Sequence, residues 1–148
     1  MNAAKLTQYG LVPVARVRIA DRNLIIDITD PKTVKLEMCI YAFLIEGKVC
    51  RIGSSKAPLE NRLKDYKRDI TNALNHKKSP APDEEAEKWK KILPDGISGD
   101  IYARQGTSVT TPIGTFPAYM DEESIMIGKI FDDGDLLPDQ ILNRNKHR

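Results

Sequence analysis

The sequence has little that would anchor it in a membrane or cross-link it. No apolar run in its 148 residues approaches the roughly 20 that a transmembrane helix needs. Residues 1–10 lack the apolar core of a signal peptide. The two cysteines, Cys39 and Cys50, lack the spacing of a zinc site. We therefore expect no membrane partner, a cytoplasmic location, and free thiols that are half-buried.

The sequence also lacks internal repeats and low-complexity segments. Hydrophobic residues make up 41% of the chain and charged residues 30%, which is typical of a globular protein rather than a disordered one. The length suits a single domain with a sizeable core, and we expect residues 1–148 to form one.

The net charge of +2 conceals a strong segregation of charge. Basic residues dominate 61–78 and recur in a tail at about 139–148, whereas acidic residues dominate 121–139. A basic face near an acidic cluster suits a polyanionic partner together with a metal ion. An unevenly charged surface in contact with solvent would explain the pattern equally well.

The hydrophobic pattern and the order of its segments predict a small α+β domain. The predicted elements, in chain order, are an N-terminal β-hairpin at about 11–30, a second hairpin at 36–53, a helix that Pro58 begins, a helix at 83–93, a strand at 100–104, a loop at 106–117, and a helix at 122–131 capped by Asp121.

The second hairpin carries a tyrosine and an arginine within apolar strands. A three-residue turn, Glu46 to Lys48, would place Tyr41 and Arg51 on the same face of the sheet, together with Phe43 and Gly53. A two-residue turn would place Tyr41 and Arg51 on opposite faces. We predict the three-residue turn.

The following helix adds a second arginine and a second tyrosine. Arg62 and Tyr66 are four residues apart and therefore lie on one helix face, beside the apolar stripe that packs on the sheet. Two guanidiniums and two phenols are thus predicted to converge. Guanidiniums bind phosphate oxygens bidentately and a phenol can transfer a proton, so the cluster suits attack on a phosphodiester.

The motif formed by "CIY" and, ten residues later, "RIG" resembles the signature of the GIY-YIG nuclease family. The resemblance implies that Arg62 in "ENRLKDY" is the catalytic arginine and that Tyr66 matches a frequent later tyrosine or histidine. It also implies that Glu123 in "DEES" binds the metal and that Asn143 in "ILNRN" matches the family's late asparagine. The implied fold is a small mixed or antiparallel β-sheet flanked by helices. The implied activity is hydrolysis of DNA phosphodiesters with one divalent metal, usually Mg²⁺, which Mn²⁺ can replace.

Two residues depart from the family signature. Cys39 replaces the first glycine, and Arg51 replaces the second tyrosine. We therefore assign Tyr41 as the general base and Arg51 as a residue that positions phosphate or water. The candidate DNA-binding residues are His76, Lys77, Lys78, Arg104, Gln105 and Arg144.

Each assignment has a plainer alternative. Tyr41 could be an ordinary core residue, and Arg51 an edge-strand arginine paired with Glu37 or Glu46. Arg62 and Tyr66 could form a surface pair. Glu123 could be an acid favoured in the first turn of a helix, and the adjacent Glu122 is a rival for the metal.

The resemblance also implies the partner and leaves other functions open. The expected partner is double-stranded DNA, in a bacterial or phage-infected cell. Because a duplex has two strands to cut, we expect a homo-oligomer, a dimer or tetramer. A DNA-binding module of the same fold that has lost its chemistry, and an RNase, remain alternatives.

Overall fold

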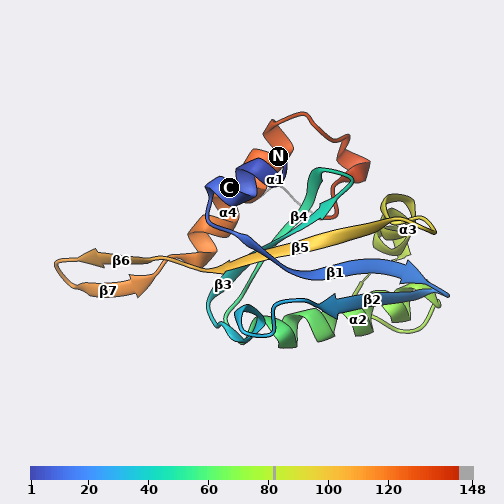
Figure 1. Cartoon of the computed structure of the whole chain (residues 1–148), viewed down its shortest axis with the longest axis horizontal. Helices are drawn as coiled ribbons and strands as arrows, with labels where there is room; N and C mark the ends of the chain where they lie inside the picture. Colours follow the sequence, from blue (N-terminus) through green and yellow to red (C-terminus); the bar gives the residue numbers. More distant parts are fainter. Residues whose placement is uncertain (82, 144–148) are drawn as a thin grey trace.

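The computed structural model describes residues 1–81 and 83–143 of the chain. Five strands form its main sheet. The strands are β1 (Val12–Ala20), β2 (Asn23–Ile28), β3 (Cys39–Ile45), β4 (Lys48–Ser55) and β5 (Ser98–Gln105). Their order across the sheet is β2-β1-β5-β3-β4, and each neighbouring pair is antiparallel (Figure 1). The predicted α+β fold is confirmed, and β2 and β4 are the edge strands.

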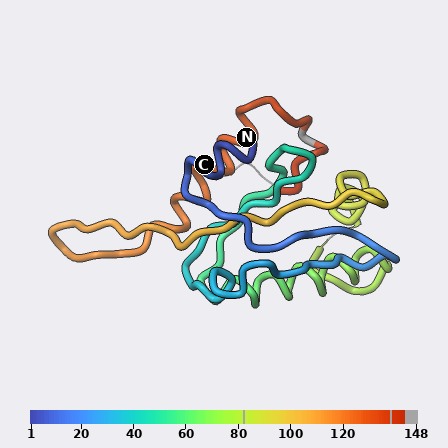
Figure 2. The backbone as a smooth tube through the Cα atoms, viewed as in Figure 1, coloured from blue at the N-terminus to red at the C-terminus, as the bar shows by residue number. Residues whose placement is uncertain are grey.

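Helices cover both faces of this sheet, as the ribbon and the backbone trace show (Figures 1 and 2). One face packs against α1 (Ala3–Gln8) and α4 (Tyr119–Asp132), and the other against α2 (Leu59–Leu74) and α3 (Asp83–Ile92). The chain also forms two short 3₁₀ helices, Thr33–Lys35 and Pro138–Gln140. The alternation of side chains along β3 supplies both cores: Tyr41 and Phe43 join the α2 side, and Ile40 and Ala42 join the α4 side.

The turn between β3 and β4 differs from the prediction. It has two residues, Glu46 and Gly47, both with positive φ (49° and 78°), as a tight hairpin turn requires. A β-bulge at Cys50 then inserts one extra residue, so that Phe43 pairs with Arg51 while Leu44 pairs with Val49. The extra residue at the bulge compensates for the even length of the turn, so Tyr41 and Arg51 point to the same face of the sheet. The predicted turn is therefore wrong, but Tyr41 and Arg51 do share a face.

The segment predicted as a loop at 106–117 instead forms a second, two-stranded sheet. Strands β6 (Ser108–Thr111) and β7 (Gly114–Pro117) make a hairpin that projects from the body of the protein (Figure 1). Threonine hydroxyls join its strands, with Thr110 and Thr115 oxygens 3.0 Å apart. Helix α4 begins directly after it at Tyr119, with Ala118 at the N-cap position, so the predicted cap at Asp121 is also wrong.

The two thiols are free, as predicted, but they are fully buried rather than half-buried. Cys39 and Cys50 are 1% and 2% exposed. Burial raises the pKa of Cys39 to about 11 and that of Cys50 to about 12. Within the described residues, no helix has the length and apolar character needed to cross a membrane.

Candidate active site

The position of β4 at the edge of the sheet allows both sheet faces to contribute to one cavity. Arg51 and Gly53 point toward the α2 side, and Ile52 and Ser54 toward the α4 side. The cavity of about 310 Å³ follows this edge. It is lined by Tyr41, Arg51, Ile52, Gly53, Ser54, Arg62, Tyr66, Glu123, Ile127 and Asn143.

Four of the predicted residues form a continuous hydrogen-bonded cluster in its wall. The hydroxyls of Tyr41 and Tyr66 are 2.7 Å apart. Arg51 Nε donates to the Tyr66 hydroxyl at 2.6 Å, and Arg62 Nε donates to the Tyr41 hydroxyl at 3.3 Å. Both guanidinium carbons also lie 5.0 Å from the centre of the Tyr66 ring, within range of a cation–π interaction.

The surroundings fix the protonation of this cluster in the free protein. Burial, with a further contribution from Tyr66, raises the pKa of Tyr41 well above its usual value, although Arg62 and Arg51 oppose the shift. Tyr41 is therefore a neutral phenol at neutral pH. Burial opposes the charge of Arg51 and Arg62, but interactions with the two tyrosine hydroxyls, and for Arg51 also with the Glu85 carboxylate, raise the pKa of each guanidinium. Both arginines are cations.

Arg51 pairs with a residue that the sequence reasoning missed. Its Nη1 atom donates to Glu85 Oε1 at 3.2 Å and to the carbonyl oxygen of Leu142 at 2.7 Å. The proposed partners Glu37 and Glu46 are not involved in this ion pair. One signal pointed to Glu85: it lies four and eight residues before Trp89 and Leu93, on the apolar face of its helix.

Glu123 reaches the cavity from the α4 side of the sheet. It lies in the second turn of α4, not in the first turn as predicted, and its Oε1 atom accepts a hydrogen bond from the Ser54 hydroxyl at 3.0 Å. Its rival Glu122 faces elsewhere. The Glu122 carboxylate pairs with Arg104 and accepts from the Thr107 amide at 2.7 Å.

The donor set suits a hydrated divalent cation that needs few protein ligands. The described residues contain no group of three or more His, Cys, Asp or Glu side chains that could enclose a metal. Glu123 offers one carboxylate beside the Ser54 hydroxyl. Mg²⁺ commonly binds one or two carboxylates, retains several waters and takes further oxygens from phosphates. The site therefore fits a hydrated Mg²⁺ shared with a phosphate.

Asn143 lines the cavity, but its amide is bonded to the sheet. Asn143 Oδ1 accepts from the Ile52 amide at 2.8 Å, and Nδ2 donates to the Ile52 carbonyl oxygen at 2.9 Å. The Leu142 amide donates to the Cys50 carbonyl oxygen at 2.7 Å. Leu142 and Asn143 thus cover the free edge of β4 where Arg51 lies.

The remaining predicted residues lie outside this cavity. His76, Lys77 and Lys78 are exposed beyond the C-terminal end of α2, about 20 Å along the helix from Arg62. Arg104 is held by Glu122 and by the Tyr9 carbonyl oxygen. Gln105 is exposed at the end of β5, and Arg144 lies outside the described residues.

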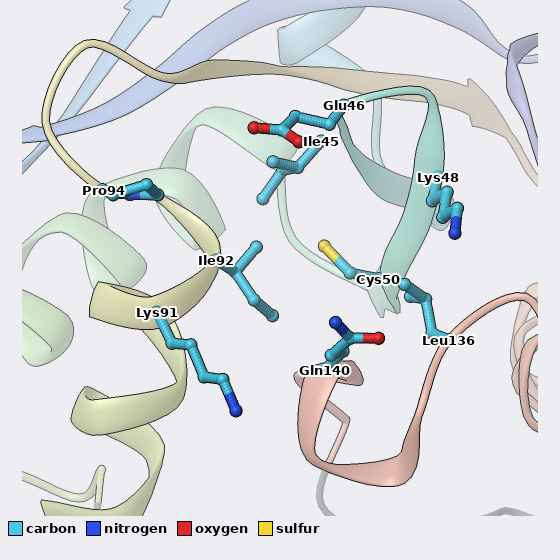
Figure 3. Close-up of a pocket in the computed structure, with 9 residues that line it drawn as sticks. All are labelled: Ile45, Glu46, Lys48, Cys50, Lys91, Ile92, Pro94, Leu136 and Gln140. Atoms are coloured by element: carbon cyan, nitrogen blue, oxygen red, sulfur yellow. The ribbon is translucent and has the colours of Figure 1, made fainter.

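A second cavity, of about 220 Å³, lies between the tip of the β3–β4 hairpin, the end of α3 and the segment around Gln140 (Figure 3). Its walls include Ile45, Ile92 and Leu136, with the Cys50 thiol between them. None of the predicted site residues lines it.

Comparisons with known proteins agree on the fold. No family model and no curated protein sequence matches the chain. A mutant of bacteriophage T4 EndoII matches with a TM-score of 0.59 and 20% identity, over 90% of this chain and 97% of that one. The restriction endonuclease HPY188I in complex with product DNA matches with a TM-score of 0.52 and 18% identity, over 93% and 84%. The resemblance to the GIY-YIG nucleases is therefore confirmed for the fold of this chain.

Proposed function

We propose that the protein is a metal-dependent endonuclease that hydrolyses phosphodiester bonds of double-stranded DNA, in the cytoplasm of a bacterial or phage-infected cell. One observation supports this most strongly. The bonded cluster of Tyr41, Tyr66, Arg51 and Arg62 lines the same cavity as the carboxylate of Glu123. The fold neighbours reported above include bacteriophage T4 EndoII and the restriction endonuclease HPY188I, and the second was solved in complex with product DNA.

The arginines supply the charge that a phosphate needs. Arg62 is half-buried, and the only hydrogen bond it makes with the described residues uses Nε, so its two Nη groups are available to the cavity. Two Nη groups can bind phosphate oxygens bidentately. Charge accumulates on these oxygens in the transition state, and a fixed guanidinium stabilises it without reorganising.

Tyr41 is our candidate for the residue that acts on the attacking water. Its hydroxyl lies on the cavity wall, between Arg62 Nε and the Tyr66 hydroxyl. We propose that it orients the water and that its phenolate form takes the proton of the water, so that the phenol is regenerated. A phenolate formed there would be stabilised by the charges of Arg62 and Arg51. Since the pKa of Tyr41 is raised in the free protein, the rate should increase with pH above neutrality.

Glu123 would hold the metal, with Ser54 fixing its carboxylate. A bound Mg²⁺, or Mn²⁺ in its place, would supply Lewis acidity toward the phosphate and its leaving oxygen. Asn143 acts by holding Ile52 and the neighbouring Arg51 in place. In our proposal Asn143 is a positioning residue rather than a catalytic one.

The basic surface of α2 gives a path for the DNA backbone. A shallow cavity of about 270 Å³ on this helix is lined by Lys64, Lys67 and Arg68, and it continues the basic run toward Lys77 and Lys78. These side chains would bind phosphates without reading sequence. A homo-oligomer, a dimer or tetramer, would supply a second site for the second strand.

Cleavage of supercoiled plasmid tests the proposal. The protein should convert plasmid to nicked and linear forms with Mg²⁺ or Mn²⁺, and EDTA should stop the reaction. Tyr41→Phe should bind DNA but not cut it. DNA binding without cleavage in either metal would favour the alternative of a DNA-binding module that has lost its chemistry. The observation behind that alternative is that Arg51 replaces the second tyrosine of the family signature. Preferential cleavage of RNA over duplex DNA would favour the RNase.

A further inference from the structure

Most of the hydrogen-bond donors of the Arg51 guanidinium bond to groups inside the protein. Its Nε atom bonds to Tyr66, and its Nη1 atom bonds to both Glu85 and the Leu142 carbonyl oxygen. Within the described residues no hydrogen bond of Arg51 uses Nη2. Three of the five donor hydrogens therefore fix the orientation of the group, and Nη2 remains for the cavity that Arg51 lines.

Glu85 supplies the only carboxylate that pairs with this cation in the described residues. The side chains of Arg51 and Glu85 are 14% and 6% exposed. An arginine does not lose its proton in a protein, so a buried guanidinium needs a counter-charge. Removing one partner of a buried ion pair leaves the other as an uncompensated charge, which costs more than removing both.

Packing of α3 fixes where Glu85 lies. Trp89, four residues later on the same helix face, is fully buried, and its ring centre is 5.4 Å from that of Phe43 and 6.2 Å from that of Tyr66. The indole therefore anchors the helix to the strand and the helix that carry the cluster. One turn earlier, the same face presents Glu85 to Arg51.

We infer that Glu85 is a positioning residue, which holds Arg51 so that one edge of its guanidinium faces the reacting phosphate, and that the two residues act as a coupled pair. This inference rests on the proposed function for its catalytic consequence only. It explains how a cation occupies the position of the family's second tyrosine. A phenol there needs no counter-charge, whereas a guanidinium needs the carboxylate that α3 supplies.

Thermal unfolding of four proteins tests the coupling without any enzyme assay. These are the parent, Arg51→Met, Glu85→Gln and the double variant. Each single substitution should lower Tm by roughly 10 °C, and the double variant should lose clearly less than the sum. Glu84→Gln is the matched control, since Glu84 lies in the same helix turn but is exposed. Glu84→Gln should leave Tm nearly unchanged, and its small effect on Tm should add to that of Arg51→Met. Additive losses for Arg51 and Glu85 would overturn the inference.

Steady-state cleavage at a temperature where each variant is folded tests the positioning role. Glu85→Gln should lower kcat about 10- to 100-fold with little change in KM, because a displacement of about 1 Å has effects of this size. Glu84→Gln should cleave like the parent. If the loss of kcat in Glu85→Gln is no larger than the fraction of that variant that is unfolded, Glu85 contributes to stability alone, and its positioning role is overturned. A parent that cuts no DNA would refute the proposed function, while the unfolding data would still decide whether Glu85 holds Arg51.

A tyrosine replacement sharpens the same test. Arg51→Tyr matches the family signature but leaves the Glu85 carboxylate buried beside a phenol. We expect Arg51→Tyr alone to lose stability and cleavage, and the combination with Glu85→Gln to recover part of both. If Arg51→Tyr alone is as stable and active as the double variant, the two positions are not coupled.

Discussion

The hydroxyl of Tyr41 occupies the space that a side chain at position 53 would fill. A Cβ atom added to Gly53 would lie 2.2 Å from the Tyr41 hydroxyl oxygen, far inside contact distance. The two residues pair across β3 and β4, so the glycine provides the space in which the phenol lies over the neighbouring strand. From there the Tyr41 hydroxyl reaches Tyr66 and Arg62. The glycine therefore determines where the proposed base lies.

Gly53→Ala should consequently displace the Tyr41 phenol and lower cleavage about 100-fold, the effect of a misplacement of roughly 1 Å. The crowding should also reduce the free energy of unfolding by about 1–3 kcal/mol. Gly128→Ala is the matched control, because an added Cβ at Gly128 on α4 meets nothing within 4 Å. It should cleave normally and be slightly more stable. Normal cleavage by Gly53→Ala would show that the phenol position is not critical.

Asn143→Ala should destabilise the protein through β4. The substitution removes both hydrogen bonds to Ile52 and leaves a buried amide without its partner, which costs about 1–3 kcal/mol. Urea unfolding measures the loss, and Asn61→Ala, at an exposed position on α2, serves as control. If unfolding of Asn143→Ala is unchanged while cleavage disappears, Asn143 acts on the substrate rather than on the strand.

The sequence predicts which face of its helix or strand each residue of the cluster occupies, because the faces follow from local periodicity. The separation of Arg62 and Tyr66 by four residues fixes a shared helix face, and alternation along β3 places Tyr41 and Phe43 on one face of the sheet. The turn was not predictable in the same way, because a bulge at Cys50 changes the parity and no residue type requires one there. The outcome for Arg51 was right although the turn length was wrong.

Contacts between distant segments were beyond sequence reasoning. Glu85 meets Arg51 across 34 residues and Asn143 meets Ile52 across 91. Such contacts depend on how α3 and the chain end pack on the sheet, which the spacing of residues does not encode. The β6–β7 hairpin was missed because its proline and glycine residues resemble those of a loop, while its threonines favour strands.

The buried thiols predict a loss of stability at alkaline pH. The pKa of Cys50 is about 12 in the folded protein, against an ordinary value near 9, so the unfolded chain ionises first. The stabilisation is complete below about pH 9 and is lost progressively up to about pH 12, with a slope near 1.4 kcal/mol per pH unit for one proton. Cys50→Ala should flatten the decline of the free energy of unfolding between pH 9 and 10.5. If the pH dependence of the free energy of unfolding is the same in Cys50→Ala as in the parent, ionisation of Cys50 does not cause the decline.

Binding of duplex DNA without metal should weaken steeply with salt, because phosphate contacts release counterions. If Lys77 and Lys78 contact the backbone, replacing both with Gln should reduce the log–log slope by up to about two units. Lys90→Gln, an exposed α3 residue paired with Glu87, should leave the slope unchanged. Fluorescence anisotropy over a salt series measures this. Equal slopes for the parent and the double variant would remove Lys77 and Lys78 from the footprint.

In our proposal, Glu123 and the cluster of Tyr41, Tyr66, Arg51 and Arg62 form one metal-dependent cleavage site. The most direct test compares plasmid cleavage and DNA binding by Glu123→Gln and Glu122→Gln in parallel. Glu123→Gln removes the proposed metal carboxylate, so cleavage should fall by at least 10² to 10³ while DNA binding persists or tightens. Glu122→Gln breaks a contact with Arg104 outside the cavity and should cut DNA once folded. Full cleavage by Glu123→Gln in Mg²⁺ would contradict the account.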